Sequence, residues 1–197
     1  MQLHFHDLGA VQERLLRGEL ADAKAFAFLL TQADSDPSMR QWDSQTRAVA
    51  DAARAVKDAG SIDEGLRLEV RVALACANCH IAAGRETIFD EPAPLPADEP
   101  TVDARMARHV WAADRLWEGI VTPSEERWLA GLQVLAAAPL PFSNATDALS
   151  LSRALAHRAQ FEIDNRAKEL LEARATAYGE LLITCAGCHA AVATAQR

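Results

Sequence analysis

The sequence is poor in lysine, in β-branched residues and in long apolar segments. Its only lysines, Lys24, Lys57 and Lys168, are too few to form a docking face ringed by lysines. No run of 18 apolar residues exists, which excludes a transmembrane helix. The net charge of -8 argues against a nucleic-acid partner, because nucleic-acid binders present clustered basic residues.

Catalytic patterns and an export signal are also missing from the sequence. We find no Ser/His/Asp set, no paired acids in an apolar pocket and no glycine-rich phosphate loop. Residues 1–20 carry His4, His6, Asp7 and Glu13 where a signal peptide would have its apolar core. The abundance of Ala and Leu over β-branched residues favours helices.

One motif, Cys-x-x-Cys-His, is present twice, at residues 76–80 (the first motif) and at residues 185–189 (the second motif). This spacing is that of covalent c-type haem attachment, in which both thiols bind the porphyrin and the His binds iron. The sequence therefore predicts two haem c groups. The residues concerned are Cys76, Cys79 and His80 in the first motif, and Cys185, Cys188 and His189 in the second.

Two other interpretations of the cysteines are weaker. A Cys₄ zinc site would leave the His of each motif unexplained and would require two distant Cys pairs to converge. A thioredoxin-type redox pair would require a βαβ context, of which the sequence shows no sign.

Amphipathic periodicity and capping signals predict eight helices. A capping box at residues 61–64 opens the helix that carries the first motif, and Gly84 closes it. Thr101 is the candidate cap of the next helix, and residues 122–125 read as the start of the one after it, with Thr122 as its cap. The expected helices cover residues 3–17, 19–33, 42–59, 62–83, 102–121, 123–137, 144–164 and 166–193.

The predicted fold class is all-α, with two tandem four-helix bundles that each hold one covalently bound haem c. Residues 85–100 contain four prolines among acidic residues and are expected to form a semi-extended linker. The first bundle would comprise residues 1–84 and the second residues 101–197.

Each half begins with Met-x-x-His, at Met1 and His4 and again at Met106 and His109. Each His lies on the apolar stripe of its helix, so we expect it to face the core. Two such His at matched positions predict bis-His ligation, in which His4 and His109 complete the coordination begun by the histidines of the first and second motif.

Other residues compete for the distal position. Met1 and Met106 lie one turn away, and a Met ligand would raise the potential. His6 is the competitor in the first half, and its counterpart in the second half is Trp111. His157 has no matching His in the first half, so we interpret it as structural or solvent-facing.

Five aromatic residues of the second half are expected to fill its core. Tyr178, seven residues before Cys185, is expected to pack on the haem or to bond a propionate. Arg71 and Arg174 are candidates for pairing with propionates or for solvated helix faces. These five residues are Trp111, Trp117, Trp128, Phe161 and Tyr178.

Three segments add to the evidence of the motifs: residues 1–5 with 18–20, residues 106–119, and residues 178–182. Together they make the chain resemble class II c-type cytochromes, the cytochrome c-prime group, and the doubled form is similar to uncharacterised dihaem c-type cytochromes of bacteria. The resemblance implies a haem motif near the end of the fourth helix and a distal position on the first. The distal His departs from that group, whose distal site is open or apolar, so gas binding is not carried over.

The function expected from these features is electron transfer through two six-coordinate haems, without enzymatic activity. A haem enzyme or gas sensor is the alternative, and it requires one five-coordinate haem. Expected partners are redox proteins or a larger membrane-bound electron-transfer complex. Because c-type haem is attached outside the bacterial inner membrane, we expect a periplasmic or otherwise exported protein. Its export signal would lie outside this numbering or in another segment.

Overall fold

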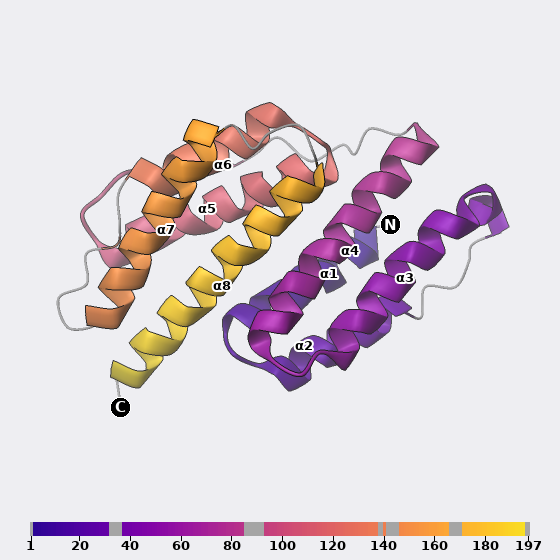
Figure 1. Ribbon diagram of the computed structural model, residues 1–197, viewed down its shortest axis with the longest axis horizontal. Helices are drawn as coiled ribbons and strands as arrows, with labels where there is room; N and C mark the ends of the chain where they lie inside the picture. Colours follow the sequence, from indigo (N-terminus) through magenta and orange to yellow (C-terminus); the bar gives the residue numbers. More distant parts are fainter. Residues whose placement is uncertain are drawn as a thin grey trace. The chain divides into compact units, whose positions relative to one another are not determined.

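The computed structural model describes residues 2–31, 37–84, 93–137, 140, 146–165 and 171–195, with the side chains of residues 2–5, 37–39, 146 and 165 excepted. Regular structure within these ranges is entirely helical (Figure 1). The elements are α1 (Gln2–Leu16), α2 (Leu20–Thr31), the 3₁₀ helix η1 (Pro37–Trp42), α3 (Asp43–Asp58), α4 (Ile62–Ala83), α5 (Val102–Val121), α6 (Glu125–Ala137), α7 (Thr146–Asn165) and α8 (Leu171–Ala195).

The all-helical class expected from the sequence is confirmed. The chain divides into two compact units, Met1–Glu86 and Thr87–Arg197, and each contains four of the described α-helices. None of the described helices is long and apolar enough to cross a membrane.

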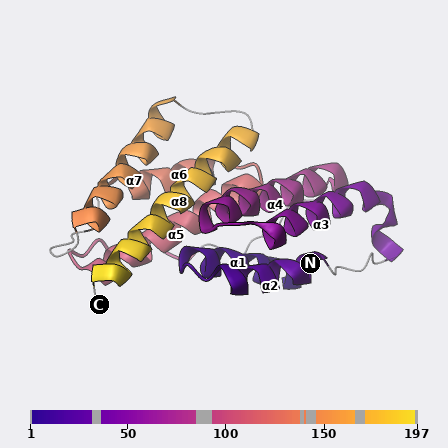
Figure 2. The same cartoon turned by 60° about the horizontal axis from the view of Figure 1, so that its bottom comes forward.

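In the first unit, each α-helix packs against the next one in the chain, and α1 also packs against α4 (Figure 2). Helix α1 buries Leu8, Val11 and Leu15, which belong to the stripe predicted for it. A Cβ atom on Gly65 would lie 2.7 Å from Cδ2 of Leu15, so the end of α1 meets the start of α4 closely. The two helices therefore run in opposite directions.

The second unit has the same order of contacts, from α5 through α6 and α7 to α8. Its closest approach joins α5 and α6. A Cβ atom on Gly119 would lie 2.8 Å from the backbone N of Trp128, and one on Gly131 would lie 2.7 Å from the carbonyl O of Ala112. Two glycines, one on each helix, thus allow the two backbones to touch.

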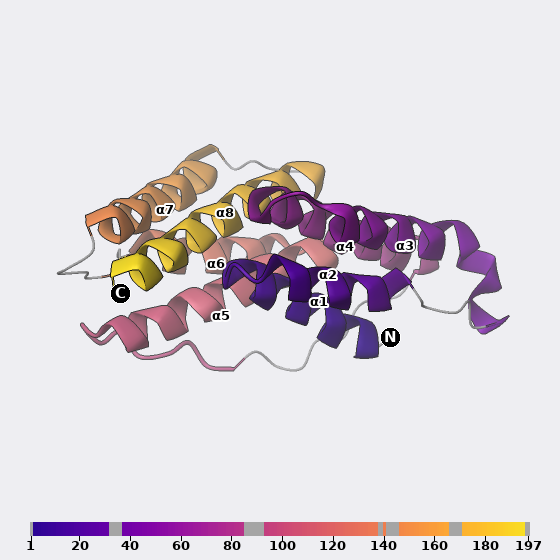
Figure 3. The ribbon, with the colours of Figure 1, turned by 90° about the horizontal axis from the view of Figure 1, so that it is seen from below.

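Helix α8 returns to α5 through Tyr178, whose side chain is buried. The Tyr178 hydroxyl donates a hydrogen bond to the carbonyl O of Ala113 at 3.2 Å. The two helices run in opposite directions (Figures 1 and 3). This bond therefore fixes which turn of α8 lies beside which turn of α5.

Three predicted helix ends are confirmed by their capping bonds. Ser61 Oγ accepts from the backbone N of Glu64 at 3.2 Å, and the Glu64 carboxylate accepts from the backbone N of Gly60 at 2.7 Å. Gly84 ends α4 in the left-handed conformation, with φ of 58°. Thr101 Oγ1 accepts a backbone N–H from the first turn of α5 at 3.2 Å.

The predicted start of α6 is wrong. Thr122 ends the preceding helix, because its hydroxyl donates to the carbonyl O of Glu118 at 2.6 Å. Ser124 takes the capping position, and its Oγ accepts from the backbone N of Arg127 at 3.3 Å. A threonine hydroxyl can bond forward as the cap of the next helix or back to the carbonyl four residues earlier, and Thr122 makes the backward bond.

The described part of the expected linker packs on the second unit. The indole Nε1 of Trp111 donates to the carbonyl O of Ala93 at 2.7 Å. The guanidinium of Arg108 donates to the carbonyl O of Pro96 at 2.7 Å. Two turns of α5 thus hold the extended segment 93–100, whereas residues 85–92 lie outside the described part of the chain.

Candidate functional site

Both Cys pairs lie toward the C-terminal end of the last helix of their unit, the first motif in α4 and the second in α8. Cys79 and Cys188 are buried, and the first Cys of each pair is partly exposed. All four thiols are free. Since the members of a pair are three residues apart, they lie almost one helical turn from each other, as attachment to one porphyrin requires.

The thiols have the opposite electrostatics to those of a redox dithiol. Burial raises the pKa of Cys76 to about 12 and that of Cys185 to about 12, with the neighbouring Cys of each pair adding to the rise. Burial also raises the pKa of Cys79 and of Cys188. Thiol redox pairs depend on a lowered pKa. These cysteines therefore do not match the thioredoxin-type interpretation.

The zinc interpretation also finds no support. Among the described side chains, no three His, Cys, Asp or Glu residues come together as metal ligands. The two Cys pairs belong to different compact units.

The His of each motif is half-buried beside its Cys pair. Burial lowers the pKa of His80, which favours the neutral imidazole that binds a metal. Four residues separate His80 from Cys76, or about 40° around the helix, so both lie on one face of α4. In each unit, two free thiols and one half-buried imidazole form a donor set that fits covalently attached haem.

His109, the distal candidate of the second unit, lies on α5 with its Nε2 atom inaccessible to solvent. It belongs to the face of α5 that also carries the buried Leu116 and Ile120, as its position on the apolar stripe predicts. It lines a small pocket between α5, α6 and the segment before α5. The pocket is lined by Asp98, Arg105, Arg108, His109, Val134 and Ala137.

The hydrogen bond between Tyr178 and Ala113 determines where His109 lies along the helix axes of the second unit. His109 lies four residues before Ala113, about 6 Å along α5, and Cys185 lies seven residues after Tyr178, about 10 Å along α8. Because the helices are antiparallel, both steps lead toward the same end of the unit. The Cα–Cβ bond of His109 leans toward the N-terminus of α5, which is the direction of the second motif. No described contact joins His109 to His189, and their shared ligation stays a prediction.

The distal candidate of the first unit can be placed only by its backbone. His4 lies in the first turn of α1, and its side chain falls outside the described residues. His4 precedes Leu15 by eleven residues, and Cys76 follows Gly65 by eleven residues, which is about 16 Å along each helix. Because Leu15 meets Gly65, the backbone of His4 lies at the height of Cys76.

The competitors for the distal positions differ in their exposure. The side chain of His6 is 79% exposed and lies 3.6 Å from the Asp7 carboxylate, so it points away from the core. Met106 is half-buried in α5, and Met1 lies outside the described residues. His157 is exposed on α7, in line with the solvent-facing interpretation.

The aromatic residues only partly fill the core. Trp128 and Tyr178 are buried, as predicted, and Trp111 and Trp117 are half-buried. The prediction for Phe161 is wrong, because its side chain is 55% exposed on α7. Periodicity along one helix does not reveal which side a neighbouring helix will cover.

The two arginines proposed for propionates lie in different surroundings. Arg174 is buried at the start of α8, with its guanidinium 6.0 Å from the ring centre of Trp128, and burial lowers its pKa. It precedes Cys185 by eleven residues, about 16 Å along the helix, so Arg174 is a packing residue here. Arg71 is exposed.

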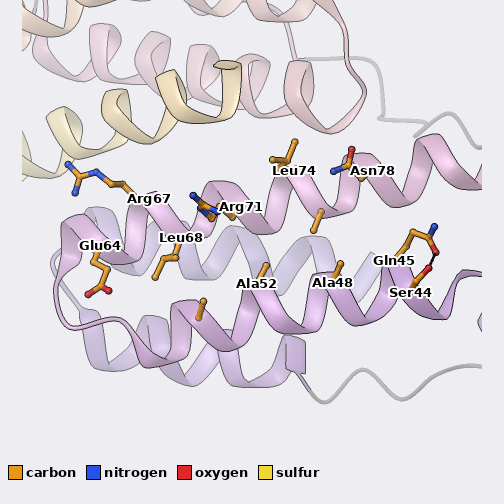
Figure 4. Close-up of a pocket in the computed structure, with 12 residues that line it drawn as sticks. Ser44, Gln45, Ala48, Ala52, Glu64, Arg67, Leu68, Arg71, Leu74 and Asn78 are labelled. Carbon is orange, nitrogen blue, oxygen red and sulfur yellow. Dashed lines mark hydrogen bonds between the residues drawn. The ribbon is translucent and has the colours of Figure 1, made fainter. Parts of the chain in front are cut away.

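Arg71 lines a groove of about 780 Å³ on the outer side of α3 and α4 (Figure 4). The floor of the groove is made of small side chains from α3, including Ala48 and Ala52. From α4 the groove receives Asn78, which lies about 200° around the helix from Cys76. No cysteine is among the residues that line the groove, although Leu68, which lies about 20° around the helix from Cys79, is one of them.

One interior residue near the first motif was missed by the sequence interpretation. Glu69 is completely buried on α4. It precedes Cys76 by seven residues, the same interval that separates Tyr178 from Cys185. Aligning the two motifs on their cysteines would have shown this exchange of an acid for a tyrosine.

No protein-family model, curated protein or solved structure matches the chain.

Proposed function

We propose that the chain is a dihaem c-type cytochrome that transfers electrons between redox partners through two six-coordinate haems. The observation that carries the proposal is the repetition of one donor set. A free Cys pair and a half-buried His lie near the end of the last helix in each of two compact helical units. Each unit would then be a four-helix bundle, for which the cyclic order of helix contacts is suited.

The residues have separate roles in this proposal. The thiols of both motifs hold the porphyrins covalently, and His80 and His189 bind iron on the proximal side. His4 and His109 hold the distal positions, which leaves no site for a substrate. A bound haem supplies one-electron chemistry, and the packed helices around it exclude water and keep reorganisation small.

The proposal includes a compartment and a class of partner. Covalent haem attachment takes place outside the bacterial inner membrane, so the protein would be periplasmic or otherwise exported. Its partners would be redox proteins, either free or within a membrane-bound complex. It would not be an enzyme.

The decisive experiment is production of the full chain together with the c-type haem maturation machinery. We expect a mass increase of two haems that survives denaturation, and low-spin spectra in both oxidation states that carbon monoxide does not change. Absence of covalent haem would refute the proposal. A carbon-monoxide-sensitive high-spin fraction would instead support the enzyme or gas-sensor alternative.

The distal ligands are tested by matched histidine variants. His109→Ala should convert one of the two haems to a form that binds carbon monoxide, whereas His157→Ala, at an exposed position of the same unit, should leave the spectrum unchanged. In the first unit, His4→Ala should have this effect and His6→Ala should not. An effect of His6→Ala alone would reassign the first distal ligand.

A further inference from the structure

The two haem motifs have different interior neighbours at one equivalent position. Counting seven residues back from the first Cys gives Glu69 in α4 and Tyr178 in α8. Glu69 is 0% exposed and Tyr178 is 1% exposed, so both side chains belong to the interior of their units. Around the helix, Glu69 lies about 20° from Cys76. It therefore lies on the same face as the thiol, about two turns away.

The influence of Glu69 reaches the motif. The pKa of Cys76 is raised first by burial, next by Cys79 and then by the charge of Glu69. The pKa of Cys185 is raised by burial and by Cys188, with no acid among the causes. The hydroxyl of Tyr178 donates to a backbone carbonyl of α5. At this position the first unit therefore has an acid where the second unit has a tyrosine.

The elements packed against α4 are α1, α3 and η1. Helix α1 carries Arg14, whose guanidinium pairs with Glu19 at 2.7 Å. The charged side chains described on α3 form exposed pairs with one another. The titratable or charged groups on these elements, Glu69 apart, are Asp63, Glu64, Arg67, Arg71, Cys76, Cys79 and His80 on α4, His4, His6, Asp7, Glu13 and Arg14 on α1, Arg40 on η1, and Asp43, Arg47, Asp51, Arg54, Lys57 and Asp58 on α3.

On the basis of the proposed function, we propose that Glu69 makes the haem of the first unit the one of lower potential, so that a single electron resides on the second. A carboxylate in the protein interior stabilises the more positive, oxidised state of a nearby iron. A negative charge about 10 Å away, at the effective dielectric constant of protein interiors, changes the reduction equilibrium about tenfold. For a one-electron couple this is about 59 mV.

The first test compares the two sites without changing Glu69. The variant Cys185→Ser/Cys188→Ser keeps only the first haem, and Cys76→Ser/Cys79→Ser keeps only the second. Spectroelectrochemical titration between pH 7 and 9 should give the lower potential for the protein that keeps the first haem. The opposite order would overturn the proposal.

The second test removes the charge and keeps the shape. In the full chain, Glu69→Gln should raise the lower of the two reduction potentials and leave the higher one unchanged. The expected rise corresponds to a change of about tenfold in the reduction equilibrium constant of that haem. Glu64→Gln is the matched control, because Glu64 lies on the same helix but is exposed and caps its N-terminus. Two potentials that stay unmoved in Glu69→Gln would overturn the inference alone. Absence of covalent haem in the unaltered chain would refute the proposed function instead.

Discussion

The contact between α5 and α6 depends on Gly119, and replacing this residue by alanine should destabilise the second unit. A Cβ atom at this position would lie 2.8 Å from the backbone N of Trp128 and 3.0 Å from both its Cα and its Cβ. These atoms belong to the backbone of α6 or are bonded directly to it. The strain cannot be relieved by rotating a side chain, so α6 would have to move as a whole.

The size of the effect is the difference between two terms. Alanine is favoured over glycine inside a helix by about 1 kcal/mol. Overpacking of a rigid contact costs about 1–3 kcal/mol, and the upper end applies here because the new Cβ atom collides with two backbone atoms of Trp128 and with its Cβ atom. We therefore expect Gly119→Ala to lower the free energy of unfolding by about 1–2 kcal/mol. For a unit of this size, that lowers the Tm by roughly 5–10 °C.

The measurement is thermal and urea unfolding followed by circular dichroism. Gly9→Ala is the matched control, because Gly9 is exposed inside α1 and a Cβ atom there would have no neighbour within 4 Å. This variant should gain up to about 1 kcal/mol from helix propensity. Equal stabilisation by the two alanines would show that α5 and α6 do not approach each other as described.

Three further predictions concern a cap, a buried ion pair and the thiols. Ser124→Ala should lower the free energy of unfolding by about 1 kcal/mol, since it removes the cap of α6. Ser150→Ala, at an exposed position of α7, is the control and should change the free energy of unfolding by less than about 0.5 kcal/mol in the same urea titration. Glu118→Ala should lower the free energy of unfolding by about 3 kcal/mol, because the Glu118 carboxylate pairs with Arg115 and Arg127 and its removal leaves the buried Arg115 charged without this partner. Glu126→Ala, at an exposed position, is the control, and equal effects of the two variants would exclude a stabilising role for the ion pair. In the haem-free protein, burial raises the folded-state pKa of Cys76 and of Cys185 to about 12 from an ordinary value of 9.0. The neutral thiols therefore contribute their full stabilisation below pH 9, and this contribution is lost as the pH rises toward 12. The urea midpoint should fall above about pH 9, and a Cys76→Ser/Cys185→Ser protein should lose most of that fall.

Helix boundaries were predictable where the capping chemistry is local and unambiguous. The expected ranges 62–83 and 102–121 agree with α4 and α5, because Ser61 and Thr101 bond within their own first turns and Gly84 readily adopts positive φ. The start of α6 was mispredicted because Thr122 bonds backward to α5. The expected helix at 42–59 omitted the short helix η1, which lies just before it.

The candidate site shows a similar division between local and tertiary information. The motifs and the stripe position of His109 are local, and the helices carry these residues as expected. The exposure of His6 and Phe161 depends on which side of their helix a neighbouring helix covers. The residue pattern of a single helix does not show which side this is. Glu69 was missed for another reason, because an acid is rarely buried and binary patterning assigns it to the surface.

The equivalent positions of α4 and α8 show that the two units share a motif but not a packing scheme. Eleven residues before the first Cys, α4 has Gly65 and α8 has Arg174. The glycine admits Leu15 of α1 against the backbone of α4, whereas the arginine packs over Trp128 of α6. In the first unit the last helix is therefore in close contact with the helix that carries His4.

This difference has a consequence for the proposed haem sites. The motif would determine which atoms attach a porphyrin, but the neighbours of the last helix would determine the electrostatic surroundings of that porphyrin. The first unit has Glu69 and Gly65 at the positions where the second unit has Tyr178 and Arg174. Two haems held by the same five-residue motif would therefore not be equivalent, and a pair of unequal sites gives the transferred electron a preferred position that two identical sites would lack.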